Sequence, residues 1–195
     1  MPGLLSPYLR NKRTSMVLPY LKGDILDIGC GPGRNRELMR ERNIPFSSYT
    51  GIEIDDKLVQ KLSAQYPDSK FYKVDLDSEK IPVNQQFDTI VLLAVIEHVF
   101  NLKFLFGQLP DLLKPDGRIV LTTPTPFGND IVHRIGTSFG LFDKEGGQDD
   151  HIAIFNKKRL EILGEEVGLS IMNYKTFQLG CNQLAVYQKV DGGIV

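Results

Sequence analysis

The feature that most constrains the fold is a glycine-rich turn near the N-terminus. Residues 24–28, DILDI, have the apolar character of a buried strand, and the turn GCGPG follows at once over residues 29–33. A polar segment of helical spacing, about residues 34–42, comes next. A strand that enters a helix through such a turn presents unpaired backbone N–H groups, without side-chain bulk, at the carboxyl edge of a sheet. Open α/β sheets bind their ligands at that edge.

Apolar runs and segments of helical spacing alternate along the rest of the chain. Further strands are expected at residues 49–54, 71–74, 87–93, 118–123, 170–177 and 183–188. Apolar helix faces are formed by Leu58, Leu62 and Tyr66, by Leu102, Phe106, Leu109 and Leu113, and, after an Asn156 cap, by Leu160, Leu163 and Val167. A turn is expected at residues 114–117. This pattern predicts an α/β fold with a seven-stranded, mostly parallel sheet, helices on both faces and an antiparallel final strand.

The length of the chain fits one domain. With 195 residues, folding buries roughly 70% of the surface that the unfolded chain exposes. An N-terminal helix is expected at about residues 8–21, whereas prolines and glycines break any regular pattern over about residues 124–150. A segment that long and irregular inside a compact domain is usually functional. We therefore predict a single domain, residues 1–195, with a functional loop at 124–150.

Composition and charge limit the cellular compartment and the binding partners that we expect for the chain. Its formal net charge is -1, so no global field draws it onto DNA or an anionic membrane. No apolar run approaches the roughly 20 residues that span a bilayer, and no secretory signal is recognisable. Cys30 and Cys181 are too few for a disulfide framework and lack the spacing of a zinc site. These features predict a cytoplasmic protein without DNA binding or stable membrane insertion, and they leave the oligomeric state open.

Two common phosphate-binding motifs do not fit the turn. The dinucleotide fingerprint G-x-G-x-x-G, started at Gly29, requires glycine at position 34 and finds Arg34. The pattern G-x-x-x-x-G-K-[ST] is absent. The chain instead combines the turn with an acidic residue, Glu53, at the end of the second expected strand. A nicotinamide-dependent oxidoreductase is therefore disfavoured.

The glycine turn and several later segments resemble the class I S-adenosylmethionine-dependent methyltransferases. The first motif of that family is similar to the run ILDIGCGPG at residues 25–33. Further matching segments follow in the family's order at residues 51–55, 74–76, 87–99 and 112–117, and the resemblance covers roughly residues 21–189. It implies a Rossmann-like methyltransferase fold and S-adenosylmethionine as cofactor. The run VIEHV at residues 95–99 is similar to ubiquinone-pathway O-methyltransferases.

The resemblance also implies roles for individual residues. The backbone of Gly29 and Gly31 would pass against the methionine and ribose of the cofactor, and Glu53 would accept hydrogen bonds from both ribose hydroxyls. Asp75 would meet the adenine amino group, and the Leu93 carbonyl would meet the methionine ammonium. The remaining cofactor candidates are Ile54 and Leu76, which would sandwich the adenine ring, together with Asp27 and Cys30. Asp27 has an equally plausible structural role in bonding the turn's own N–H groups, and Cys30 is interpreted as a packing residue in this cofactor site.

No catalytic residue can be copied from the family, because methyl transfer needs a general base only when the acceptor loses a proton. Histidines accept protons near neutral pH, so His98 and His151 are the candidate bases. The resemblance favours a small-molecule or lipid-linked acceptor, methylated at oxygen. One alternative is a non-catalytic S-adenosylmethionine-binding sensor or partner subunit. The other is a metal-dependent RNA 3′-end methyltransferase, whose ligand set is incomplete because Ala94 occupies the first carboxylate position.

Two further features concern the acceptor. Aromatic residues at 127, 139 and 142 would build an acceptor pocket or pin the loop to the core. The first 22 residues contain Arg10, Lys12, Arg13 and Lys22 and no acidic residue. That basic cluster has two interpretations, attraction of an anionic substrate and an ordinary solvated helix face.

Overall fold

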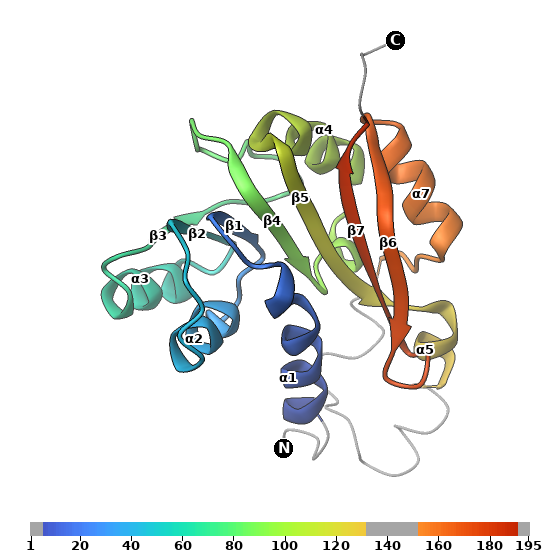
Figure 1. Cartoon of the computed structure of the whole chain (residues 1–195), viewed down its shortest axis with the longest axis horizontal. Helices are drawn as coiled ribbons and strands as arrows, with labels where there is room; N and C mark the ends of the chain where they lie inside the picture. Colours follow the sequence, from blue (N-terminus) through green and yellow to red (C-terminus); the bar gives the residue numbers. More distant parts are fainter. Residues whose placement is uncertain (1–5, 132–151, 191–195) are drawn as a thin grey trace.

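The computed structural model describes residues 6–131 and 152–190, and these form a single seven-stranded sheet in the order β3-β2-β1-β4-β5-β7-β6 (Figure 1). The strands are β1 (Asp24–Ile28), β2 (Ser48–Glu53), β3 (Lys70–Lys73), β4 (Phe87–Leu93), β5 (Leu113–Pro124), β6 (Leu169–Phe177) and β7 (Asn182–Lys189). The α-helices are α1 (Ser6–Val17), α2 (Arg34–Glu41), α3 (Asp56–Gln65), α4 (Leu102–Leu112), α5 (Pro126–Ile131) and α7 (Lys157–Glu165). Two short 3-10 helices are η1 (Leu18–Tyr20) and η2 (Ile96–His98).

The pairing of the strands confirms the predicted architecture. β1 lies between β2 and β4 and is parallel to both, and β3 and β5 continue the parallel sheet on either side. β7 runs antiparallel to β5 and to β6, so it is the antiparallel strand that the sequence predicts. The strand order reverses between β1 and β4, and the crevice beyond the carboxyl ends of strands at such a switch point is where α/β sheets bind ligands.

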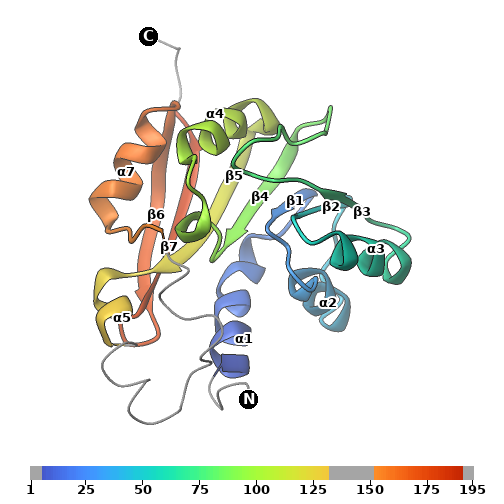
Figure 2. The ribbon, with the colours of Figure 1, turned by 180° about the vertical axis from the view of Figure 1, so that it is seen from behind.

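Alternating side chains of the central strands bury both faces of the sheet. Ile25 points toward the layer that contains α2 and α3, where it packs with Leu38 and Leu62. Its neighbour Leu26 points the other way, into the core that includes Phe106 of α4 and Leu160 of α7. These two helices lie on the face of the sheet that Figure 2 shows. Because successive strand residues face opposite sides, a central strand with both faces covered is mostly apolar.

Helix α1 covers the sheet beside the carboxyl ends of β4 and β5, at the lower edge of the sheet in Figure 1. Its last residue, Val17, is fully buried and packs against Val120 of β5 and Leu184 of β7. The hydroxyl of Thr89 in β4 donates to the carbonyls of Tyr20 and Lys22 and fixes the connection from α1 to β1. These contacts hold α1 at the ligand-binding edge.

Helix starts follow local capping rules. The Asp55 carboxylate accepts from the backbone N–H groups of Lys57 and Leu58 at the start of α3. The Asn156 side chain accepts from the Arg159 N–H at 2.9 Å, which confirms the expected cap of α7. Such caps satisfy N–H groups that the first turn of a helix leaves unpaired.

The structure corrects two local expectations. Leu113, expected on the inward face of α4, begins β5, because α4 ends at Leu112 and its last turn contains Pro110, which lacks an N–H. Residues 114–117, expected as a turn, belong to the start of β5, where the register with β4 shifts between Phe87 and Thr89. This irregularity in the pairing accommodates turn-like residues within the strand.

The segment that was expected to be irregular begins with regular secondary structure. β5 extends to Pro124, and α5 occupies residues 126–131. The Thr125 hydroxyl accepts from the Gly128 N–H at 2.9 Å, so a threonine cap and a proline in the first turn favour this helix. Residues 132–150 of the expected loop lie outside the described residues, and so do positions 139 and 142.

Candidate functional site

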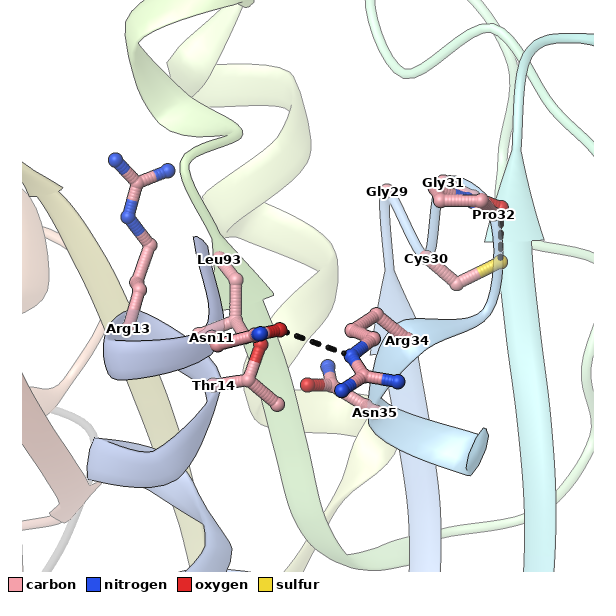
Figure 3. A pocket seen from close by; sticks show the side chains of 10 residues that line it. All are labelled: Asn11, Arg13, Thr14, Gly29, Cys30, Gly31, Pro32, Arg34, Asn35 and Leu93. Carbon is pink, nitrogen blue, oxygen red and sulfur yellow. Dashed lines mark hydrogen bonds between the residues drawn. The ribbon is translucent and has the colours of Figure 1, made fainter. Parts of the chain in front are cut away.

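Two cavities meet at the glycine turn, and Gly29 belongs to the wall of both. The larger, of about 460 Å³, lies between α1 and the turn and is lined by Asn11, Arg13, Thr14, Gly29, Cys30, Gly31, Pro32, Arg34, Asn35 and Leu93 (Figure 3). The smaller, of about 260 Å³, is lined by Gly29, Ile52, Glu53, Ile54, Val74, Asp75, Leu76, Asp77, Ala94, Val95, His98 and Val99. The site therefore has two chambers, one on each side of bare main chain.

The conformation of the turn requires glycine. Gly29, Gly31 and Gly33 have φ values of 68°, 52° and 78°, in the left-handed region that side chains with a Cβ rarely adopt. A Cβ added at Gly31 would meet no atom within 4 Å, so it would project into open space. A Cβ added at Gly29 would lie 2.5 Å from Cγ2 of Val95. The missing side chain of Gly31 therefore leaves space in which a ligand could lie against the backbone. The missing side chain of Gly29 leaves space that Val95 of the protein occupies.

Glu53, at the end of β2, is hydrogen-bonded to the glycine turn and lines the smaller cavity. Its Oε2 accepts from the Gly31 N–H at 2.8 Å, and its Oε1 accepts from the N–H groups of Ile54 and Asp55 at 2.8 and 3.2 Å. An ionised carboxylate has about four lone-pair sites, so Oε2 keeps capacity for a further donor. A ligand hydroxyl at this point would bond to a carboxylate that is already oriented.

The wall beyond Glu53 is partly apolar. The Ile54 side chain is 60% exposed although it borders the cavity, and Leu76 lies in the same wall. Asp75 stands next to them, where its carboxylate accepts from the Asp77 N–H at 3.0 Å and the Ser78 hydroxyl at 2.9 Å. These two bonds, that from Asp77 first, lower the pKa of Asp75, so it is ionised at neutral pH. Aliphatic surface beside a fixed carboxylate suits a flat heterocycle with an amino group.

Asp27 lies beneath the turn and in neither cavity wall. It is 1% exposed, and its Oδ2 accepts from Asn35 Nδ2 at 2.9 Å and from the Tyr49 hydroxyl. Burial raises the pKa of Asp27 to about 6, the two hydrogen bonds oppose the shift, and the charge of Glu53 adds to it. The carboxylate therefore joins β1 to α2 and β2 through side-chain hydrogen bonds. The sequence left two roles open for Asp27, binding of the cofactor and hydrogen bonding to the turn's own N–H groups.

The larger cavity is closed on one side by α1. Arg34, at the start of α2, donates from Nε to Asn11 Oδ1 of α1 at 3.1 Å (Figure 3). Arg34 also pairs with Glu37 and Glu41 of its own helix. Thr14 and Asn35 complete the polar lining on this side. A hydrogen bond thus joins α1 to α2 at the cavity.

Cys30 and Leu93 lie in the same wall. Cys30 is 7% exposed, and burial, with the charges of Asp27 and Glu53, raises the pKa of its thiol far above neutrality. A thiol in that state is a packing group, as the sequence suggests, and not a nucleophile. Leu93 ends β4 and is partly buried. The next residue, Ala94, has a left-handed φ of 55°, a conformation that is strained for a non-glycine residue and is found at functional sites.

Of the two catalytic candidates, only His98 lies among the described residues, and it is not part of this wall. His98 is exposed and lines the smaller cavity with Asp75 and Leu76, whereas Leu93 lines the larger one. His151 lies outside the described residues. Glu97, next to His98, is fully buried and accepts from the Thr123 hydroxyl at 3.0 Å. Burial raises the pKa of Glu97, and the positive charge of Arg13 acts against that shift.

Sequence reasoning missed the residues that α1 contributes. Asn11, Arg13 and Thr14 belong to the larger cavity, but the helix that carries them gives no motif. The only signal is the basic cluster of the first 22 residues, of which Arg13 is a member.

Among the described residues, no group of three or more histidine, cysteine, aspartate or glutamate side chains is placed to hold a metal ion. Nor does any helix in the described ranges have the length and apolar character to cross a membrane.

Comparison with known proteins identifies the family. The chain matches the methyltransferase domain family over residues 5–173 and belongs to it. This confirms the predicted class, an S-adenosylmethionine-dependent methyltransferase domain of class I. The lining of the two cavities fits that cofactor, because Glu53 offers a carboxylate to hydroxyl groups and the backbone at Gly31 faces open space.

Individual relatives match over part of their length. The trans-aconitate 2-methyltransferase of Agrobacterium fabrum is 34% identical over 98 residues, which are 50% of this chain and 37% of that protein. The malonyl-[acyl-carrier protein] O-methyltransferase of Acetivibrio thermocellus is 29% identical over 51% of this chain and 35% of that protein. The chain thus spans less than two fifths of the length of these curated relatives. The magnesium protoporphyrin IX methyltransferase of Synechocystis PCC 6803, solved with bound S-adenosylhomocysteine, shares the fold with a TM-score of 0.68 and 16% identity, over 93% of this chain and 84% of that one.

Proposed function

We propose that this protein transfers a methyl group from S-adenosylmethionine to an oxygen atom of a small-molecule or lipid-linked acceptor. The observation that carries the proposal is the pair of cavities that share Gly29, with Glu53 in the wall of the smaller one and open space at Gly31 in the larger one. Family membership supports the reaction. The malonyl relative, named as an O-methyltransferase, supports oxygen as the receiving atom.

The smaller cavity would hold the nucleoside. Glu53 would accept from the ribose hydroxyls through its remaining lone-pair capacity, and Asp75 would accept from the adenine amino group. Ile54 and Leu76 would cover the faces of the adenine ring. The exposed Ile54 supports this assignment, because a large aliphatic side chain at a cavity rim gains stability when a ring covers it.

The larger cavity would hold the methionine part. Its wall offers the backbone at Gly29 and Gly31, the end of β4 at Leu93 and the amides of Asn11 and Asn35. A methionine ammonium needs acceptors such as carbonyl oxygens, and its carboxylate needs N–H donors. Asp27 would act through Asn35, since that residue both bonds Asp27 and lines the cavity.

The bound cofactor supplies a methyl group on a positively charged sulfur, which is a good leaving group. The acceptor oxygen forms a bond to the methyl carbon while the carbon–sulfur bond breaks, and the protein contributes positioning and exclusion of water. His98 stays a predicted base, although it lines the nucleoside side of the site. The cytoplasmic location, the role of His151 and the extent of the domain stay predictions as well.

Calorimetric titration with S-adenosylmethionine, S-adenosylhomocysteine and NAD tests the proposal. We expect micromolar binding of the first two ligands and none of the third. An acceptor panel with mass-spectrometric detection of methylated products then separates an enzyme from a protein that only binds the cofactor. Equal binding of NAD, or no binding of S-adenosylmethionine, would overturn the assignment.

A further inference from the structure

Asn35, in the first turn of α2, brings a buried amide with one unsatisfied atom to the wall of the larger cavity. The residue is 6% exposed and lines that cavity. Its Nδ2 donates to Asp27 Oδ2 at 2.9 Å, whereas its Oδ1 has no hydrogen-bond donor among the described residues. Buried polar atoms usually have a partner, because a group that has lost its water without one destabilises the protein. The wall therefore contains an acceptor that is left for a donor from outside these residues.

The carboxylate of Asp27 fixes the orientation of this amide. Burial raises the pKa of Asp27 to about 6, so the group is ionised at neutral pH. An ionised carboxylate can only accept hydrogen bonds, so Asn35 must turn its NH₂ group toward Asp27 and its oxygen away from it. Figure 3 shows the amide inside the cavity with its oxygen on the side of α1. The acceptor is thus oriented before any ligand binds.

The charge behind the amide favours a cation at its oxygen. Asp27 is 1% exposed, and its hydrogen-bond partners in the described ranges, Asn35 and Tyr49, are both neutral. An amide that donates to a carboxylate is polarised, which makes its oxygen a stronger acceptor. A positively charged donor at that oxygen would also offset the buried negative charge across the amide. The chemistry of Asn35 and Asp27 together therefore suits an ammonium group.

The arginines in the same wall do not supply that donor. Arg34 forms ion pairs with Glu37 and Glu41 of its own helix, so its positive charge is offset by two carboxylates. Figure 3 shows the guanidinium of Arg13 directed away from Asn35. The oxygen of Asn35 accepts from neither of them.

We propose that the side-chain oxygen of Asn35 accepts a hydrogen bond from the α-ammonium group of S-adenosylmethionine, so that Asn35 selects cofactors with a free amino group. The inference rests on the proposed function and specifies how the larger cavity recognises its ligand. The family resemblance implies only the Leu93 carbonyl for this group. Leu93 lines the same cavity, and an ammonium has three N–H donors, so one ligand nitrogen can use both acceptors. Asp27 is then a positioning residue that acts through Asn35.

Two variants separate this contact from other effects of the wall. Asn35→Leu keeps the approximate size of the side chain and removes its acceptor. Asn11→Leu is the matched control, because Asn11 is an amide of the same cavity whose Oδ1 already accepts from Arg34 Nε. Urea unfolding of each variant shows whether the fold is retained. If only the loss of a polar lining matters, both variants should behave alike.

The ligands are S-adenosylhomocysteine and its desamino analogue, in which hydrogen replaces the α-amino group, and calorimetry measures their affinities. The native protein should bind S-adenosylhomocysteine about 10- to 100-fold more tightly than the analogue. Asn35→Leu should reduce that preference at least fivefold, by weakening S-adenosylhomocysteine while the affinity for the analogue stays within threefold. Asn11→Leu should change the two affinities by the same factor and keep the native preference.

The side-chain NH₂ signals of Asn35 in the native protein provide a second measurement, which is independent of how well Asn35→Leu folds. In ¹⁵N spectra they should shift when S-adenosylhomocysteine binds and shift much less with the desamino analogue. The inference is overturned if both ligands shift these signals equally, or if Asn35→Leu folds and keeps the native preference. Equal weakening of both ligands by Asn35→Leu would show a structural role only and would also overturn it. Failure of the native protein to bind S-adenosylhomocysteine would instead reject the proposed function.

Discussion

The two cavities are built in different ways, although they share Gly29. The smaller one is formed mainly by residues at or just beyond the carboxyl ends of β2, β3 and β4, whose relative positions are set by parallel pairing such as Glu53 with Lys73. The larger one needs α1, which arrives from the N-terminus and is joined to the turn side by the exposed Asn11–Arg34 bond. The comparison teaches that the parallel sheet itself places the lining of the smaller cavity, whereas a separately packed helix completes the larger one.

The sharpest test of the turn compares two glycines, Gly29 in the wall of both cavities and Gly31 in the wall of the larger one. Gly29→Ala should destabilise the fold by about 4 kcal/mol, because its Cβ would lie 2.5 Å from Val95 and the φ of 68° is left-handed. Gly31→Ala should cost only about 1 kcal/mol of stability, since its Cβ enters open space. Its cofactor affinity should nevertheless fall at least tenfold, because the added methyl group occupies part of the cavity that the ligand needs.

Urea unfolding and calorimetry measure these two effects on the same samples. A Gly31→Ala variant with native cofactor affinity would contradict the placement of a ligand against this backbone. Equal destabilisation by the two substitutions would show that the turn is packed in the same way on both sides. Gly107→Ala, in α4, is a suitable control because an added Cβ meets no atom within 4 Å there.

Asp27 beneath the two cavities should make stability depend on pH. Its pKa is raised by burial from 3.8 to about 6, so the folded protein binds a proton more tightly than the unfolded chain does. This contribution to stability is therefore complete below pH 3.8 and is lost as the pH rises through about 6. The loss amounts to at most about 3 kcal/mol, at 1.36 kcal/mol for each pKa unit.

The Asp27→Asn variant isolates this effect. Its amide oxygen can accept from Tyr49 and Asn35 as the carboxylate does, but it has no charge to desolvate. We expect the difference in unfolding free energy between variant and native protein to move in favour of the variant from pH 5 to pH 7. Chemical denaturation at each pH measures it. A difference that is constant over this range would show that Asp27 keeps its ordinary pKa in the folded protein.

Glu53 tests the smaller cavity alone. Glu53→Ala should weaken S-adenosylhomocysteine binding about 10- to 100-fold, because it removes the proposed ribose contacts and the bond that holds the Gly31 N–H. Asp56→Ala is the matched control, since this exposed acid lies three residues away and bonds only Gln60 among the described contacts. Adenosine serves as a second ligand that occupies one chamber. If Glu53→Ala affects S-adenosylhomocysteine but not adenosine, the ribose assignment is wrong.

The smaller cavity was largely predictable from the sequence because its residues are local. Glu53 and Asp75 follow apolar runs, and the glycine turn follows another, so the parallel topology brings them to one edge of the sheet. The same logic placed β4 and its end at Leu93. It failed for Leu113 and residues 114–117, where a proline near the end of α4 and a register shift between β4 and β5 decide the boundary.

The larger cavity was not predictable, because its lining depends on packing between distant segments. Nothing in the sequence near Asn11 or Thr14 states that α1 docks against β5 and β7 through Val17. Asp27 was assigned to the cofactor or to the turn, but its partners are side chains of Tyr49 and Asn35, whose approach follows from the sheet register and the direction of α2. Short motifs thus indicate where strands end. Hydrogen bonds between side chains of different layers can be identified only from the folded structure.

The smallest predicted effect concerns the bond that joins α1 to α2. Asn11→Ala should lower S-adenosylhomocysteine affinity about two- to fivefold and should not change adenosine affinity, because Asn11 lines only the larger cavity. The effect is small because the bond is exposed and contributes below about 1 kcal/mol. A double-mutant cycle with Arg34→Ala separates the bond from direct ligand contact, since both variants leave α1 anchored by Val17. Coupling between the two positions that appears only with ligand bound would mean that α1 is drawn toward the turn by the ligand, and the larger cavity would then be completed by binding itself.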